Sequence, residues 1–565
     1  MSAARGGTQA RRTLAATAAI LLEIAIIAFL LLLLSVVLTG GGVFYLADIR
    51  IRARSANNPV WILTALLVAR YALEVVAIRP RISPLARMLN AAASWMDGVA
   101  SAARPICRRP VALVLGLAAA TFTIKVIIAW SSPGFFSGDD VEIHEMSIGL
   151  LLGQRWSVWE LRSAFFPLTF VYPAQWLAQA AGVAGPGALV LAGRTSVAFF
   201  STAALPLTWL AARRLIPAAP HVASLAVIFL AVNKLFISFG SSELPRPVST
   251  VFVVGAFLLM LRPAMISAMA AGVLLGIAAA FRFSEVVFVA AAVAPLALSG
   301  QWRRALCLAL SAIVCAAAVT ALADLLYWGS PLSSALAAVD YTLVQRQSSR
   351  GYQPAWAYVR IIPAWSTPLV VALAIAGSSR RHPDSWWLWM PIAVLSVLPH
   401  KESRYLIPVI PFLSIAAARG LVRVVAWARV DLDPIGIRRG TLSLLAPLLI
   451  LSLLHDAGGW RLGRADEGIR LARYLRESGG AGIAAEDFWT LGGRPYMWQQ
   501  DPLLNLDSAM LADRTAVEAA LADKQWVAVH PRSVGSGAET LLHSLRFARD
   551  PSWSGEDYVL YRRQR

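Results

Sequence analysis

The stretch LPHKESRYLIPVIP, residues 398–411, places a group of polar side chains between two strongly apolar runs. Ionisable side chains at membrane depth are energetically costly, and they usually mark a functional site. Whether a membrane is the right setting for this stretch depends on the rest of the chain. The polar residues of the stretch are His400, Lys401, Glu402 and Arg404.

The composition of the chain indicates a membrane protein. Of its 565 residues, 58% are hydrophobic and 15% are charged, whereas ordinary soluble domains are about 25% charged. The mean hydropathy is +0.62, and many apolar runs reach the roughly 20 residues that a helix needs to cross a bilayer. The sequence therefore predicts an all-α polytopic protein of the cell or inner membrane, in contact with membrane lipids.

The net charge of +19 has two interpretations. In a soluble protein it would suggest nucleic acid as a partner, but the chain shows no helix-turn-helix or aromatic-basic pattern. Arginine that concentrates in cytoplasmic loops explains the charge equally well. We therefore expect no nucleic-acid partner.

The arginines also predict the topology. The loop at about 79–109 is rich in arginine and should be cytoplasmic, as should the N-terminus, so the loop that begins at residue 131 faces outward. The apolar stretch 164–182 contains two prolines and several polar and aromatic residues, which favours an interfacial helix over a span. With that assignment about 13 spans follow, every basic pair is cytoplasmic, and the C-terminus lies outside.

Three parts of the chain are expected. Residues 1–110 form two spans and a basic cytoplasmic loop. Residues 111–456 form the transmembrane domain, with a large first outer loop at 131–188. Residues 457–565 are polar: DEGIRLARYLRESGG predicts a helix ended by glycine, and WVAVHP and DYVLYRR predict strands. This last part should be a small α/β extracytoplasmic domain.

Acids and cations gather on the predicted outer face. The first outer loop contains SGDDVEIHEMS (137–147) and SVWELRSAFFP (157–167), and later outer segments contain SSELPRP (241–247) and FRFSE (281–285). Sugar transfer from a lipid-phosphate donor needs a carboxylate that accepts the proton of a hydroxyl. It also needs cations that hold the phosphate and stabilise the leaving group. The pattern is typical of such a reaction.

The same residues are also compatible with simpler roles. The acids Asp139 and Asp140 could be solvated loop residues, Arg282 and Glu285 could form a structural ion pair, and cations near helix ends could reach toward the interface. Carboxylates also suit divalent cations. A metal site is therefore conceivable at Asp139, Glu142, His144 and Glu145, although we expect none and no other cofactor.

The opening stretch resembles a known signature. HKESRYLIPVIP is similar to the HKE-x-RF/Y-x-x-P-x-x-P motif of the polyprenyl- (dolichyl-) phosphate-mannose-dependent mannosyltransferases, glycosyltransferase family 22, which share the GT-C fold. GDDVEIHEMS resembles the acidic first loop of that family, VWELRSAFFP its WE…IRS…P segment, and DLLYWGSP (324–331) its D-x-x-x-Y-G segment. These matches occur in the family's order and cover about 111–430.

The departures from the family concern the substrate more than the mechanism. Ser-Gly stands before the acidic pair in place of His-Pro, and the second acid is Asp140 rather than Glu. The family's R-T-x-S-N-S-x-E stretch appears only as SSELPRP, and two N-terminal spans look added. Mannose is therefore the expected sugar, with arabinose or an aminosugar as alternatives.

The resemblance implies a role for each matching residue. Asp139 would be the general base on the acceptor hydroxyl, with Asp140 as its neighbour or substitute, in an inverting direct displacement without a covalent intermediate. The donor phosphate would be held by His400, Lys401 and Arg404. Weaker substrate-binding candidates are Glu160, Arg162, Glu243, Arg246, Arg282, Glu402 and Tyr405.

The implied partners are a polyprenyl-phosphate sugar donor and a lipid-linked or glycan acceptor. A lipid or sugar transporter without catalysis is the alternative from another class. Transporters often contain internal repeats and broken helices at the membrane midplane. The chain shows no repeat, and its charges gather on one face, which favours an enzyme.

Overall fold

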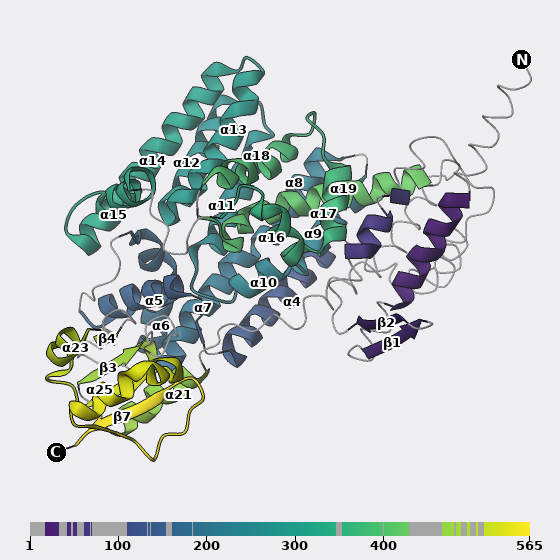
Figure 1. Cartoon of the computed structure of the whole chain (residues 1–565). Coiled ribbons are helices and arrows are strands. Elements are labelled where there is room, and N and C mark those ends of the chain that lie inside the picture. Colours follow the sequence, from purple (N-terminus) through teal and green to yellow (C-terminus); the bar gives the residue numbers. More distant parts are fainter. Residues whose placement is uncertain are drawn as a thin grey trace, which may run out of the picture.

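The structure is a computed structural model, and it describes residues 17–32, 42–46, 49–53, 61–67, 69–70, 110–132, 134–135, 137–153, 161–183, 185–217, 219–345, 353–398, 400–428, 466–479, 482–486, 494–497, 504–506 and 513–564. A helical bundle makes up most of it, and a smaller domain with a β-sheet lies at one end (Figure 1). The fold class expected from the sequence, helical with a C-terminal α/β domain, is confirmed at this level.

The bundle begins with α4 (Pro110–Ser131) and α5 (Gly138–Leu151). A continuous helix follows, in which the π-helical segment η1 (Pro167–Val171) runs directly into α6 (Tyr172–Ala180). The next helices are α7 (Pro186–Thr202), α8 (Ala204–Leu215), α9 (Pro220–Ala231), α10 (Lys234–Phe239), α11 (Pro245–Met260) and α12 (Met265–Phe281). Many of them begin at a proline, whose fixed φ and missing N–H suit the first helical position.

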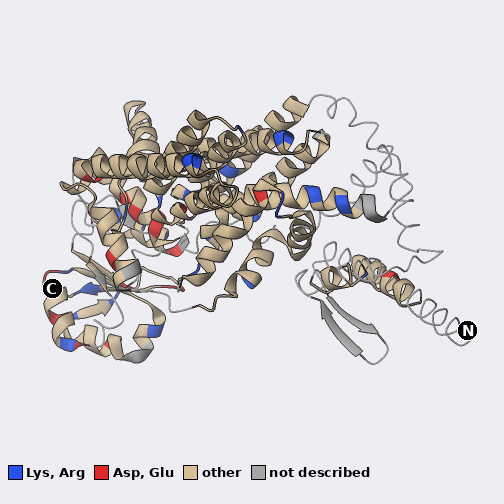
Figure 2. Cartoon of the chain, turned by 90° about the horizontal axis from the view of Figure 1, so that it is seen from above, with Lys and Arg blue, Asp and Glu red and all other residues tan. Residues whose placement is uncertain are grey.

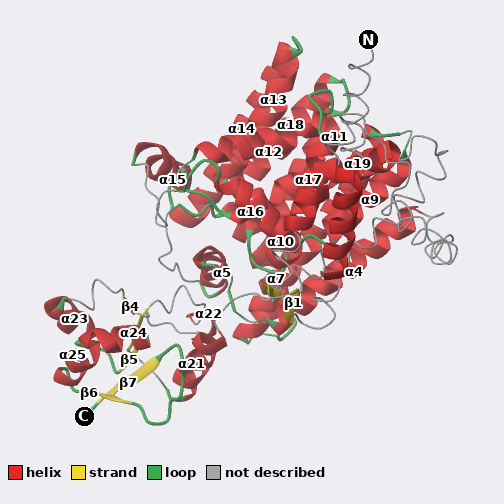
Figure 3. Ribbon diagram, turned by 45° about the vertical axis from the view of Figure 1, so that its right-hand side comes forward, coloured by secondary structure: helices red, strands yellow, loops and turns green. Residues whose placement is uncertain are grey.

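The second half of the bundle begins with η2 (Phe283–Val286), α13 (Val287–Leu298), α14 (Trp302–Trp328), α15 (Ser333–Val339) and η3 (Asp340–Val344). It continues with α16 (Ala357–Ser366), α17 (Pro368–Gly377), α18 (Pro383–Val397), η4 (Ser403–Val409) and α19 (Ile410–Ala428). Figure 3 shows these helices as one packed group, separate from the strands of the C-terminal domain.

The expected number of about 13 spans is not confirmed. In the part of the chain that the structure describes, four helices are long and apolar enough to cross a membrane: Pro110–Ser131, Pro186–Leu215, Trp302–Trp328 and Ser403–Val424. A fifth results if α16 and α17, which meet at 107°, count as one span. Other expected spans are apolar helices of at most 17 residues, such as α11 and α12. Residues 429–456, the end of the expected transmembrane domain, and the basic loop 79–109 lie outside the described residues.

The structure does not test the interfacial assignment of 164–182, which stays a prediction. The η1–α6 segment is not among the helices that could span a membrane. Its side chains Trp176 and Leu177 are exposed, as expected for an amphipathic helix at a lipid interface. One element was not anticipated: a hairpin of β1 (Gly42–Leu46) and β2 (Ile49–Ala53) follows the helix Thr17–Leu32 within the expected two-span region.

Close helix crossings hold the bundle together. A Cβ atom added to Gly377 of α17 would lie 1.8 Å from the carbonyl oxygen of Ala416, and one added to Gly420 of α19 would lie 1.9 Å from that of Leu373. Small residues allow the backbones of membrane helices to approach this closely, and van der Waals packing then replaces the hydrophobic effect that water supplies elsewhere.

The C-terminal domain contains a five-stranded mixed sheet with strand order β4-β3-β5-β7-β6. The strands are β3 (Ile483–Glu486), β4 (Leu504–Leu506), β5 (Trp526–Val529), β6 (Phe547–Arg549) and β7 (Val559–Arg563). The first three are parallel, and β7 is antiparallel to β5 and β6. Its helices include α21 (Asp466–Glu477), α22 (Arg494–Met497), α23 (Arg514–Leu521) and α25 (Glu539–Ser544).

Candidate active site

Asp139 lies at the centre of a buried cluster of arginines. Its Oδ1 is 2.6 Å from Nη2 of Arg162, and its Oδ2 is 2.7 Å from Nη2 of Arg282 and 2.9 Å from Nη1 of Arg404. The three arginines come from three segments that are far apart in the sequence. The structure therefore brings together four residues that the sequence analysis singled out separately.

The start of α5 decides which of the two neighbouring acids enters the cluster. The carboxylate of Asp140 accepts a hydrogen bond of 2.7 Å from the backbone N–H of Ser137, the N-cap residue. An acid at the third helical position that binds the N-cap N–H is half of a capping box. Asp140 therefore caps the helix, while Asp139, one residue earlier, points at the arginines.

The charges around Asp139 determine its protonation. Burial by itself would raise the pKa of Asp139, but the guanidinium groups of Arg282, Arg404 and Arg162 outweigh burial and hold the pKa well below its ordinary value. Burial raises the pKa of Glu142, and its partner Arg162 only partly opposes that effect. Asp139 is therefore ionised in the ligand-free site.

The opening stretch supplies Arg404 and the residues that orient it. Glu402 accepts a hydrogen bond from Nε of Arg404 and lies 3.4 Å from Nε2 of His400. Burial would raise the pKa of Glu402, but the hydrogen bond with His400 and the charge of Arg404 lower it to about 2. The ionised carboxylate of Glu402 can hold the guanidinium of Arg404 in one orientation, whereas the sequence predicted a contact with substrate.

Lys401 contacts backbone carbonyls beside the cluster, and its expected role in holding the donor phosphate stays a prediction. Its Nζ donates to the backbone carbonyls of Gln353 and Leu398, at 2.9 and 2.5 Å, and its side chain is buried. In the ligand-free site Lys401 therefore connects the backbone at Gln353 to the backbone at Leu398, beside the cluster. Arg404, and not Lys401, makes the contact with Asp139.

Arg246 and Tyr405 form the next layer. The guanidinium of Arg246 lies 4.2 Å above the ring of Tyr405, its Nε is 3.6 Å from Oε1 of Glu285, and its Nη2 donates to the hydroxyl of Ser284. The charge of Arg246 also acts on Asp139. These residues extend the positive region along the starts of α11, η2 and η4.

One expected residue, Glu243, lies outside this cluster. Glu243 pairs with His144 at 2.8 Å, on the other side of α5. Glu160 lies outside the described residues, which omit 154–160. Conversely, the sequence analysis missed Ser137, whose hydroxyl accepts a hydrogen bond of 2.7 Å from Nη1 of Arg404. The pattern of serine followed three residues later by an acid was the available signal.

The proposed set of metal ligands is divided between two environments. Asp139 and Glu142 face arginines, whereas His144 faces Glu243. Among the described residues no group of three or more histidine, cysteine, aspartate or glutamate side chains is arranged to hold a metal ion.

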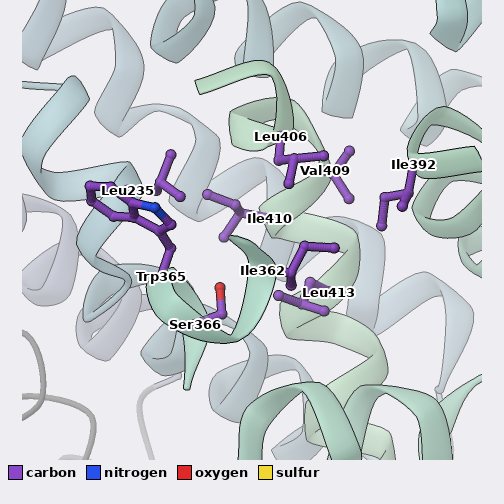
Figure 4. A pocket seen from close by; sticks show the side chains of 9 residues that line it. All are labelled: Leu235, Ile362, Trp365, Ser366, Ile392, Leu406, Val409, Ile410 and Leu413. Atoms are coloured by element: carbon purple, nitrogen blue, oxygen red, sulfur yellow. The ribbon is translucent and has the colours of Figure 1, made fainter. Parts of the chain in front are cut away.

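An apolar cavity lies next to the opening stretch. It encloses about 20 Å³ and is lined by Leu235, Ile362, Trp365, Ser366, Ile392, Leu406, Val409, Ile410 and Leu413. Figure 4 shows these side chains converging from α10, α16, α18, η4 and α19. Leu406 and Val409 belong to η4, the 3-10 helix that also carries Arg404. In the view from above, basic and acidic residues are sparse over the helices, and red and blue segments lie together near the C-terminal domain (Figure 2).

Comparisons with known proteins show the family and the fold of the chain. The chain matches the Alg9-like mannosyltransferase family over residues 147–461, more than half of its length, and it belongs to that family. No curated protein matches the chain.

Solved structures show the same fold. ArnT from Cupriavidus metallidurans, bound to undecaprenyl phosphate, superposes with a TM-score of 0.55 at 13% identity, covering 80% of this chain and 97% of that one. The oligosaccharyltransferase from Archaeoglobus fulgidus, in complex with zinc and sulfate, gives 0.53 at 12% identity, covering 80% and 73%. The fold is that of the GT-C membrane enzymes, and the protein is a membrane glycosyltransferase.

Proposed function

We propose that the protein transfers a sugar, mannose by its family membership, from a polyprenyl-phosphate donor to a hydroxyl of a lipid-linked or glycan acceptor. The observation that carries this proposal is the contact of one buried carboxylate, Asp139, with the guanidinium groups of Arg162, Arg282 and Arg404. One group in this arrangement can accept a proton, and the others can bind a phosphate.

The reaction is a direct displacement with inversion. The acceptor oxygen bonds to the anomeric carbon as the bond from that carbon to the phosphate oxygen breaks. The proton of the acceptor hydroxyl passes to Asp139, and the polyprenyl phosphate leaves with the electron pair. Arg404 and Arg282 stabilise the negative charge that develops on it, since preorganised cations in a buried site act more strongly than in water.

Donor binding would activate Asp139 as a base. A carboxylate held by three guanidinium groups accepts a proton poorly, because the best general bases have a pKa near the working pH. A bound phosphate would draw Arg404 and Arg282 toward its own oxygens. Asp139 would then lose part of the positive charge that lowers its pKa. The base would gain strength only when the donor is present.

The polyprenyl chain would occupy the apolar cavity. The cavity is lined almost wholly by apolar side chains, and it lies beside the helix that carries Arg404. The enclosed space of about 20 Å³ has room for about one water molecule, so the lining helices would have to move apart to admit the first isoprene unit. The rest of the chain would lie in the bilayer.

The positions of the basic residues support an outward-facing site. Arg214 of α8 donates to the carbonyl of Leu258 near the end of α11, and Arg304 of α14 donates to that of Arg262. These arginines thus gather at one end of the helices, whereas Arg246 and Arg282, in the cluster, lie at the opposite end of α11 and α12. Cytoplasmic ends of membrane helices are rich in arginine, so the cluster and the C-terminal domain would face outward.

Sugar transfer tests the function directly. Purified protein in lipid nanodiscs is incubated with radiolabelled polyprenyl-phosphate mannose and a membrane lipid extract, beside matched donors that carry arabinose or an aminosugar. We expect a labelled product from the mannosyl donor, and none from the Asp139→Asn variant. Label from another donor alone would correct the sugar, and no transfer from any polyprenyl donor would contradict the proposed function.

Orientation has its own test. Ser330 and Ser299 are exposed and flank α14, one on each side. After replacement of the three native cysteines, a membrane-impermeant thiol reagent should label Ser330→Cys in intact cells and Ser299→Cys only after permeabilisation. The reverse pattern would show that the cluster faces the cytoplasm.

A further inference from the structure

α5 carries a second polar group on the side that faces away from the arginine cluster. His144 lies five residues after Asp139, which places the two side chains about 140° apart around the helix. Nearly every residue from Asp139 to Gly149 is buried, so α5 is enclosed on all sides. The contacts on the rear side of α5, the face that carries His144, therefore also determine where Asp139 points.

The rear side is held by a buried pair with no role in the proposed reaction. Nδ1 of His144 is 2.8 Å from Oε2 of Glu243. Gln175 of α6 accepts a hydrogen bond from the hydroxyl of Ser147 and donates to Glu243 at 3.4 Å. The chain leaves room for this pair, because a Cβ atom on Gly193 of α7 would lie 1.9 Å from Oε1 of Glu243. α5, α6, α7 and the turn before α11 therefore meet at Glu243.

The C-terminal domain reaches the same place. Tyr496 of α22 is buried, and its ring centroid is 6.4 Å from that of Phe135, which in turn is 5.7 Å from the ring of His144. Arg194 lies over the ring of Phe135 at 4.9 Å, and it donates to the carbonyls of Ser132 and Gly134. The segment before α5 is thus enclosed between the bundle and the domain.

The contact is part of a continuous apolar core. Phe135, Val141 of α5 and Val190 of α7 share one buried cluster with Ile469, Leu475 and Trp526 of the C-terminal domain. The domain is therefore packed against the helix that carries Asp139. A flexible tether would not bury side chains from both parts in one core.

We propose that Tyr496 and the His144–Glu243 pair are positioning residues for Asp139, so that docking of the C-terminal domain is required to complete the active site. The inference rests on the proposed function for its kinetic consequence. Its structural consequence, that Tyr496 restrains α5, does not depend on that function. Small displacements of a catalytic group cost large factors in rate, so loss of the restraint should lower kcat more than it raises KM for the donor.

The main variants separate the ring of Tyr496 from its hydroxyl. Tyr496→Ala should lower kcat at least about tenfold and change the donor KM less than about twofold, while amide hydrogen exchange in residues 138–151 becomes faster. Tyr496→Phe, which keeps the ring, should have the kcat of the wild type and the wild-type exchange rate in residues 138–151. Glu243→Gln, which weakens the pair with His144, should reproduce the effect of Tyr496→Ala without touching the domain.

Phe547→Ala is the matched control. Phe547 is equally buried in the same domain, but it belongs to the core on the other side of the sheet. It should destabilise the domain and leave exchange in 138–151 unchanged. Unchanged exchange in Tyr496→Ala, or equal effects of Tyr496→Ala and Phe547→Ala, would overturn the proposal. Because exchange is measured without substrate, a wild-type protein that transfers no sugar would refute the proposed function and leave this test intact.

Discussion

The carboxylate of Asp139 and the guanidinium of Arg404 lie 2.9 Å apart, between Oδ2 and Nη1, although they stand at opposite ends of the transmembrane domain's sequence. The same guanidinium contacts Ser137 and Glu402. One arginine therefore links the loop at the start of α5 to the start of η4. In the proposed reaction, the start of α5 would contact the acceptor hydroxyl, and the start of η4 would bind the donor phosphate.

The two neighbouring acids of α5 should respond differently to mutation. Asp139→Asn removes the proposed base and should lower kcat by about 10²–10⁴. It also leaves buried arginines without their shared partner, so we expect a loss of thermal stability as well. Asp140→Ala removes a cap contact and should cost about 0.5–2 kcal/mol of stability with a much smaller loss of kcat. Kinetics and thermal unfolding in detergent measure both, and equal loss of kcat in the two variants would contradict the assignment.

Arg404→Lys should weaken the use of the donor. Lysine keeps the charge but cannot contact Asp139, Ser137 and Glu402 at once, because it lacks the planar fork of donors. We expect the donor KM to rise at least about tenfold, since one well-placed hydrogen bond to a charged group contributes about 1.5–3 kcal/mol. The acceptor KM should change little. Titration with undecaprenyl phosphate should show the same weakening, and unchanged affinity would exclude Arg404 as a phosphate ligand.

Glu402 should stabilise the fold in a pH-dependent manner. Its pKa is lowered from its ordinary value of 4.5 to about 2. A depressed pKa contributes stability that is fully present above the unfolded-state value and is lost as the pH falls toward the folded-state value. Wild type should therefore unfold at a higher temperature than Glu402→Gln at pH 7, and the difference should shrink between about pH 4.5 and 2. A difference that stays constant over that range would show that Glu402 contributes through packing alone.

The crossing of α17 and α19 should tolerate no added methyl group. Gly420→Ala places a Cβ atom 1.9 Å from a backbone carbonyl, so the helices must separate, and overpacking of this kind costs about 1–3 kcal/mol. Gly116→Ala is the control, because nothing lies within 4 Å of its added Cβ atom and alanine favours a helix over glycine. The unfolding temperature should fall for Gly420→Ala, and it should stay the same or rise for Gly116→Ala.

Much of the fold class could be read from local patterns. Apolar runs and low charge indicated a helical membrane protein, because the bilayer accepts only segments whose backbone hydrogen bonds are internal. The number of spans could not be read in this way. Hydropathy detects apolar runs, but α11 and α12 are short, and packing against neighbours determines how such helices end and tilt.

The sequence by itself determined the membrane class, the helical bundle with an α/β C-terminal domain, and the types of residue that gather at the site. Only the tertiary structure decided that Asp139 faces the arginines while Asp140 caps α5, that Lys401 binds backbone carbonyls, and that Glu243 pairs with His144. The physical reason is the same in each case. A motif specifies chemical groups, but their partners depend on side-chain direction around a helix and on which distant segments pack together, and both are set by the whole fold.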